Sequence, residues 1–127
     1  RGDVLVYVPQ DKTVFTGDIL FNGGHPAIWA GPVSNWIRAC ERMLEWDLET
    51  VVPGHGPASD SVKDDLQLTR DYLLHLRRTM GEAARNLDPF DEAYARTDWS
   101  RFEKLPLFNA ANRMNAYNTY LLMEQAK

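Results

Sequence analysis

The sequence has a single cysteine, no excess of basic residues and no long apolar run. These three features argue against an internal disulfide, an anionic partner and a membrane-spanning segment. Cys40 alone cannot form an internal disulfide, which fits a reducing compartment and a cytoplasmic protein. Fourteen Lys and Arg against eighteen Asp and Glu give a net charge of -4, which argues against nucleic acid or an anionic membrane as a partner. No apolar run approaches the roughly 20 residues that span a bilayer, and the first residues are not a signal peptide.

What the chain does contain is enough for one compact α/β unit. It has 127 residues, of which 44% are hydrophobic, so a substantial core can form. The chain begins at Arg1, directly before a strand and without methionine, so we expect a piece of a longer protein. The patterns predict a hairpin of residues 3–9 and 13–16, a loop over 19–32, a helix over 33–46, a strand over 49–52, an irregular turn over 53–57, a helix over 59–85 capped by Ser59 or Asp60, a short helix over 87–95 and a final helix over 107–125.

The helix periodicities predict which residues are buried. In the first helix Val33, Trp36, Ile37, Cys40, Met43 and Leu44 share one face, and in the second Val62, Leu66, Leu73, Leu76 and Met80 do. In the last helix we expect one face to comprise Phe108, Ala111, Met114, Asn118, Leu121 and Leu122. We interpret the amide-rich residues Asn109, Asn112, Arg113, Asn115 and Asn118 as a solvated or partner-facing side in preference to a substrate site.

Two short motifs carry the chemistry. Thr16-Gly17-Asp18 and Pro53-Gly54-His55-Gly56 each follow a run of β-branched residues, so each presents one metal-ligating side chain where a strand is expected to end. A carboxylate in such a position can bridge two cations, although an isolated Gly-Asp pair is more often a simple turn. The second motif is more specific, because proline and glycine on both sides hold the His55 imidazole at little entropic cost.

With Asp3-Val4-Leu5-Val6-Tyr7-Val8 ahead of them, these motifs resemble the C-terminal half of a metallo-β-lactamase-fold hydrolase. The stretch from Ile28 to Pro57, with Trp29-Ala30-Gly31-Pro32 and Asn35-Trp36 before the helix, is most similar to cyclase-like or quinoprotein-relay-like members. The resemblance implies half of an αββα sandwich, a mixed sheet with packed helices over residues 1–58, followed by a helical extension over 59–127 in the same compact unit. It implies that Asp18 bridges two metal ions, expected to be zinc, and that His55 ligates one.

The sequence departs from that family because the early H-x-H-x-D-H cluster is absent. Asp18 and His55 are two ligands, whereas a catalytic zinc site normally has three from the protein. His25 could supply a third, although we favour a loop or substrate-contact role for it, and Trp29 is a second candidate for substrate contact. A dimer, or an N-terminal half outside this chain, could also complete the site. His75 is interpreted as a solvated surface residue.

The sequence therefore predicts the C-terminal portion of a dinuclear zinc hydrolase that acts on a small-molecule ester, thioester, lactam or phosphodiester. The parent protein would be the enzyme, and this chain alone is expected to be inactive. The alternative is a non-catalytic half-domain that dimerises, or pairs with a partner half, and binds metal weakly or not at all.

Overall fold

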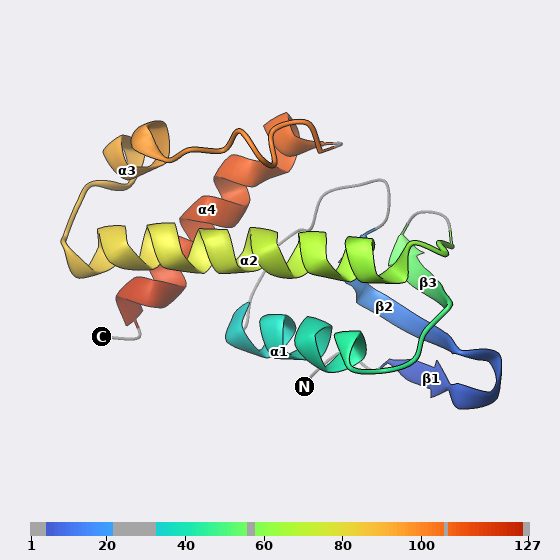
Figure 1. Cartoon of the computed structure of the whole chain (residues 1–127). Helices are drawn as coiled ribbons and strands as arrows, with labels where there is room; N and C mark the ends of the chain where they lie inside the picture. The colour runs from blue at the N-terminus through green and yellow to red at the C-terminus, as the bar shows by residue number, and fades with distance from the viewer. Residues whose placement is uncertain (1–4, 22–32, 56–57, 106, 126–127) are drawn as a thin grey trace.

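The computed structural model describes residues 5–21, 33–55, 58–105 and 107–125. Within these residues the fold is mixed α/β, with a three-stranded mixed sheet and four helices (Figure 1), as the sequence predicted at this level. The elements in chain order are β1 (Val6–Val8), a 3-10 turn (Pro9–Asp11), β2 (Thr13–Phe21), α1 (Val33–Leu44), β3 (Thr50–His55), α2 (Val62–Arg85), α3 (Phe90–Arg96) and α4 (Phe108–Gln125). None of the described helices is both long and apolar enough to cross a membrane.

The sheet has the order β1-β2-β3, with β1 antiparallel and β3 parallel to the central strand β2. The predicted hairpin is confirmed, and its turn closes at Lys12, whose left-handed backbone lets its N–H donate to the Pro9 carbonyl at 3.2 Å. The Lys12 carbonyl in turn accepts hydrogen bonds from the N–H groups of Glu49 and Thr50. The hairpin turn is thereby tied to the start of β3.

Two strands are longer than predicted. β2 does not end at Thr16 but continues to Phe21, and β3 includes Pro53 and His55, which were expected in a turn. Gly17 has a φ of 55°, and the register shifts on both sides of it, so β2 stays paired to β3 through an irregular stretch instead of leaving the sheet. Proline is tolerated in β3 because that strand has only one neighbour in the described sheet.

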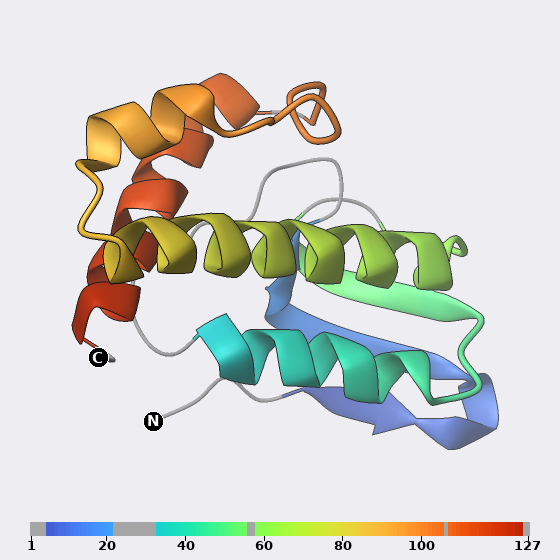
Figure 2. The ribbon, with the colours of Figure 1, turned by 60° about the vertical axis from the view of Figure 1, so that its left-hand side comes forward.

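Helices α1 and α2 lie side by side on one face of the sheet (Figure 2). The predicted buried face of α1 is confirmed, and together with α2 and the strands it forms one core cluster, made of Val14, Cys40, Met43, Val51, Val62 and Leu66. On the strands, Val6 and Phe15 are paired in register and remain 54% and 44% exposed. The described part of the chain thus leaves some apolar strand surface uncovered.

Helix α2 begins later than predicted, at Val62. Ser59 pairs with Val51 in an isolated bridge, and its Oγ accepts a hydrogen bond from the N–H of Ser61 at 3.0 Å, so neither Ser59 nor Asp60 is the N-cap. The predicted buried face of α2 is confirmed in all five positions. Helix α3 also begins later, at Phe90, because Leu87 adopts a left-handed backbone that ends α2.

The second core cluster lies where α2 crosses α4, and here the prediction for α4 is wrong. The buried residues of α4 are Asn112, Asn115, Ala116 and Thr119, whereas Met114 is exposed. Asn112 and Asn115 were expected to face solvent or a partner, but they are buried because the hydroxyl of Tyr72 in α2 offers them hydrogen bonds. Asn109 and Arg113 of the same predicted set are exposed, as expected.

Candidate functional site

The pairing of β2 with β3 brings the two predicted metal ligands onto adjacent parallel strands. Gly17 lies opposite Pro53 and Phe21 lies opposite His55, so Asp18 and His55 both fall within the last paired stretch of the two strands. β2 advances from Gly17 to Phe21 while β3 advances only from Pro53 to His55, and the bulge absorbs the difference. His25 and Trp29 lie outside the described residues.

Asp18 and His55 are residues of the types that bind transition-metal ions, but two protein ligands are fewer than a catalytic site normally has. A carboxylate and an imidazole are both zinc ligands, yet a catalytic zinc site normally takes three ligands from the protein. The side chains of Asp18 and His55 lie outside those that the structure describes, and among the described side chains no three His, Cys, Asp or Glu residues gather as a ligand group. Because these two residues are one ligand short of that number, a catalytic zinc site that included them would need at least one further donor.

Comparison with models of known protein families finds a match, and it covers the strand-rich part of the chain. Residues 1–55 match the model of the metallo-beta-lactamase superfamily. This segment belongs to the metallo-β-lactamase superfamily. The match ends at His55, the last residue of β3, so it includes Asp18 and His55 together with α1. A search of curated proteins finds no match to the chain.

Cys40 lies in the core of this metallo-β-lactamase segment, as predicted. It is fully buried between α1 and the sheet, and burial raises the pKa of its thiol to about 12. A thiol that stays protonated is a poor nucleophile and a poor metal ligand. Cys40 therefore serves packing and takes no part in the candidate site.

Beyond the metallo-β-lactamase match, a buried polar network fixes α3 and α4 against α2. The Tyr72 hydroxyl donates to Asn112 Oδ1 at 2.6 Å and accepts from Asn115 Nδ2 at 3.2 Å. Asn112 Nδ2 donates in turn to the Tyr94 hydroxyl of α3 at 3.1 Å. Burial raises the pKa of Tyr72, so its hydroxyl keeps its proton and its donor role.

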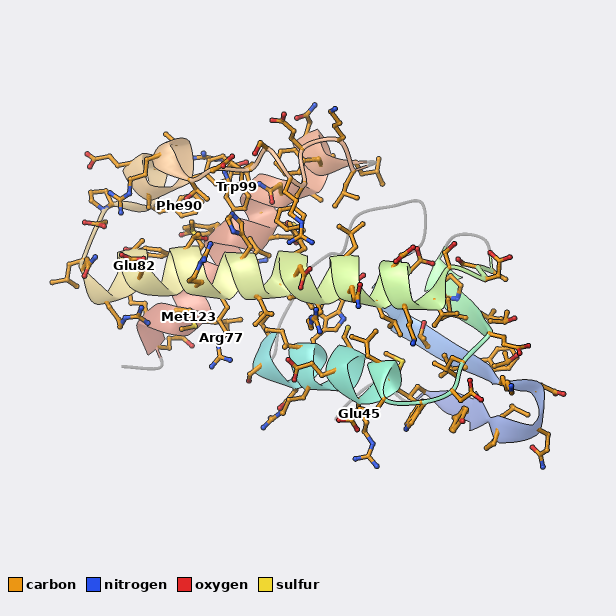
Figure 3. The ribbon with its side chains drawn as sticks, in the orientation of Figure 1. Glu45, Arg77, Glu82, Phe90, Trp99 and Met123 are labelled. Atoms are coloured by element: carbon orange, nitrogen blue, oxygen red, sulfur yellow. The ribbon has the colours of Figure 1, made fainter. Side chains whose placement is uncertain are left out.

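Aromatic side chains fill the space between α3, α4 and the connection that joins them. Phe90 and Trp99, labelled in Figure 3, lie on that side of α2, whereas Arg77 lies on its other side. Trp99 contacts Tyr94 at a ring-centroid distance of 5.3 Å and Phe108 at 6.3 Å. The ring of Trp99 therefore anchors the connection against α3 and α4.

His75 of α2 is half-buried, not solvated as predicted. Its Nε2 lies 2.9 Å from the carbonyl oxygen of Asp98, and its ring packs edge-on against Trp99 at 5.3 Å. Because a carbonyl only accepts, Nε2 carries the proton, and Nδ1 is left to accept from Arg78 at 3.4 Å. Burial is the main cause that lowers the pKa of His75, so the ring is neutral near pH 7.

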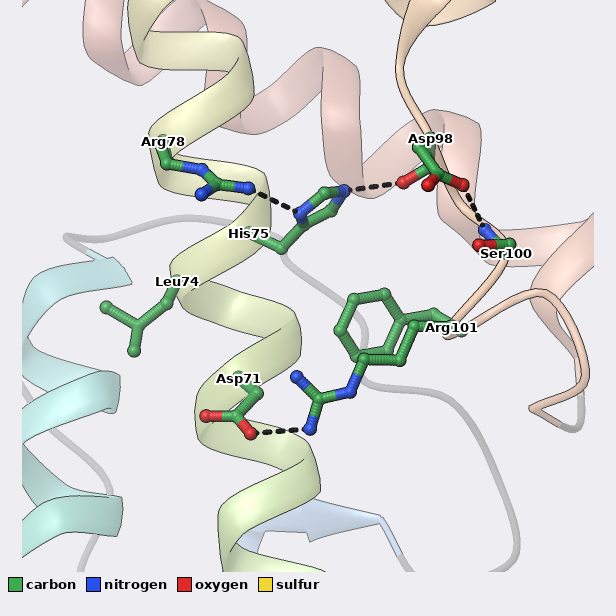
Figure 4. Close-up of a pocket in the computed structure, with 8 residues that line it drawn as sticks. Asp71, Leu74, His75, Arg78, Asp98, Ser100 and Arg101 are labelled. Atoms are coloured by element: carbon green, nitrogen blue, oxygen red, sulfur yellow. Dashed lines mark hydrogen bonds and ion pairs between the residues drawn. The ribbon is translucent and has the colours of Figure 1, made fainter.

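A hollow of about 430 Å³ opens between α2 and the connection after α3 (Figure 4). Its lining residues are Asp71, Leu74, His75, Arg78, Asp98, Ser100, Arg101 and Phe102. Sequence reasoning missed it because its two walls are far apart along the chain and show no motif. The available signal was the set of arginines in both segments, which the overall negative charge concealed.

Proposed function

We propose that this chain is the C-terminal portion of a metal-dependent hydrolase with a dinuclear zinc centre. The observation that supports this most directly is the parallel pairing of β2 with β3. It puts Asp18 and His55 on neighbouring strands within a segment that matches the metallo-beta-lactamase superfamily.

In this proposal Asp18 holds both cations and His55 ligates one of them. When bound, the metal would lower the pKa of a coordinated water and polarise the scissile group of the substrate. The chain's own contribution is positional. The β2–β3 pairing fixes the backbone of both ligands, and Gly17 supplies the positive φ that the bulge beside Asp18 requires.

The remaining ligands would come from a part of the protein outside this chain. The exposed pair Val6 and Phe15 supports this, because an αββα sandwich would bury such apolar strand surface against its second half. The substrate would be a small ester, thioester, lactam or phosphodiester, with His25 and Trp29 as candidate contacts.

The same exposed pair supports the second candidate function, a half-domain that associates with another copy or with a partner half and performs no chemistry. Val6 and Phe15 lie opposite each other on neighbouring strands, so they form one small apolar patch rather than scattered contacts. An assembly of this kind needs no metal for its stability.

Zinc content separates the two functions. The chain, equilibrated with zinc and dialysed, would be analysed beside the variants Asp18→Asn and His55→Ala and the control Asp64→Asn, which removes an exposed carboxylate of α2. Zinc retained by the chain and the control but lost in both site variants supports the metal centre. Zinc that survives both substitutions contradicts it. A zinc-free chain favours the second function, or a centre that forms only when the donors outside this chain are present. Sedimentation of the same samples reports the oligomeric state.

A further inference from the structure

The hollow between α2 and the connection after α3 has the makings of a binding site separate from Asp18 and His55. Phe102 in one wall is almost fully buried and packs edge-on against Tyr72 at 5.3 Å. The N–H of Phe102 also donates to the Trp99 carbonyl at 2.8 Å, which fixes the turn that forms one wall. Its volume lies within the range of small-molecule sites.

Two arginines and two aspartates line this hollow, and Arg70 beside it also bonds one of the aspartates. Arg101 donates to Asp71 Oδ2 at 2.7 Å, but Asp71 also accepts from Arg70 Nε at 3.2 Å, so two guanidinium groups share one carboxylate. Those two arginines hold the pKa of Asp71 below its usual value, against the opposing effect of burial. Asp71 therefore stays ionised and cannot neutralise both arginines.

Arg78 is the second cation at the hollow, and no described carboxylate pairs with it. Its one described hydrogen bond goes to the neutral imidazole of His75, at the long distance of 3.4 Å. The other carboxylate at the hollow, Asp98, accepts from the backbone N–H of Ser100 at 2.9 Å. A guanidinium bound only to a neutral ring gains more from an oxyanion, because charge-assisted hydrogen bonds are roughly twice as strong.

Leu74 gives the hollow an apolar wall. It is 41% exposed although it lies one turn from both Asp71 and Arg78, and it is one of the residues that line the hollow. Arg101 lies 5.4 Å from the centroid of the Phe102 ring, which restrains its guanidinium on the opposite wall. The hollow thus combines two arginines and two aspartates with apolar surface.

We propose that this hollow binds a small organic molecule that carries an oxyanion, a carboxylate or a phosphate ester. The guanidinium of Arg78 binds the oxyanion together with the free donors of Arg101, and the apolar body of the ligand rests on Leu74. The proposal does not depend on metal chemistry at Asp18 and His55, so each can fail without the other.

Calorimetric titration with benzoate, phenyl phosphate and inorganic phosphate tests the site, and benzylamine serves as the cationic control. Arg78→Gln should weaken binding of the organic anions by about tenfold or more, because it removes the least-paired cation. Arg77→Gln is the matched control, since it removes the same charge from the neighbouring position on the other side of α2 (Figure 3). It should change the affinity by less than about twofold.

A second variant keeps the test independent of Arg78. Leu74→Glu places a carboxylate at a position already exposed, so the fold should tolerate it, and it should abolish binding of both organic anions. Circular dichroism of each variant reports folding. Selective loss in Arg78→Gln and Leu74→Glu supports the site, and tighter binding of phenyl phosphate or of benzoate distinguishes the two anion classes. No saturable binding up to about 10 mM, or equal weakening in Arg77→Gln, overturns the proposal.

Discussion

Replacing Tyr72 with phenylalanine tests whether the buried polar network holds the C-terminal helices in place. The substitution leaves the ring in the core and removes only the hydroxyl that contacts Asn112 and Asn115. Two hydrogen bonds are lost at about 1 kcal/mol each, and the two buried amides are left without this partner. We expect the free energy of unfolding to fall by about 2–4 kcal/mol, a large share of the stability of a domain this size.

Urea unfolding followed by far-UV circular dichroism measures this loss as a lower midpoint with an unchanged slope. Tyr117→Phe is the matched control, because it removes a hydroxyl from a half-exposed ring of α4 and should change stability by less than about 0.5 kcal/mol. The pair Tyr72→Phe and Asn112→Leu should cost less together than the sum of the single changes. A loss below about 1 kcal/mol in Tyr72→Phe would refute the reasoning, since the amides would then be satisfied without the hydroxyl.

Three further predictions concern single residues. Leu87→Gly should stabilise the protein by about 1 kcal/mol, because Leu87 is 75% exposed and has a strained backbone φ of 58° at the end of α2. The N–H groups of Leu87 and Asp88 donate to carbonyls of the last turn of α2 and close the helix there. Leu87→Ala keeps the strain, so a thermal melt should show a gain for Leu87→Gly and none for Leu87→Ala. Lowering the pH through 6.5 should reduce the free energy of unfolding. The reason is that the pKa of His75 is lowered in the native state, so the unfolded state binds a proton there more readily than the native state does. If the free energy of unfolding of His75→Gln falls with pH as steeply as that of the unchanged protein, this explanation is ruled out. Cys40 should resist a thiol reagent in the native state and react only after unfolding, since burial raises its pKa to about 12, and rapid native labelling would contradict its placement in the core.

Local pattern was enough to predict the elements whose burial depends on a simple apolar stripe. The helix over 33–46 and the helix ending at Arg85 both appear with the expected buried faces, and the hairpin turn forms at Lys12. In these elements apolar side chains recur with the helical period and bury against one continuous surface, so the sequence carries the whole signal. The motifs around Asp18 and His55 were also sufficient to indicate the superfamily that residues 1–55 match.

What the sequence determined by itself was therefore the helical stripes, the hairpin and the two ligand motifs, because each depends on neighbours a few residues away. Only the tertiary structure decided that Asn112 and Asn115 are buried. A buried amide needs a hydrogen-bond partner, and here the partner is Tyr72, about forty residues earlier in the chain. The tertiary structure also decided that β2 runs on past Gly17, because pairing with β3 outweighs a local turn signal. The hollow beside His75 likewise exists only because two segments, distant in sequence, meet across α2.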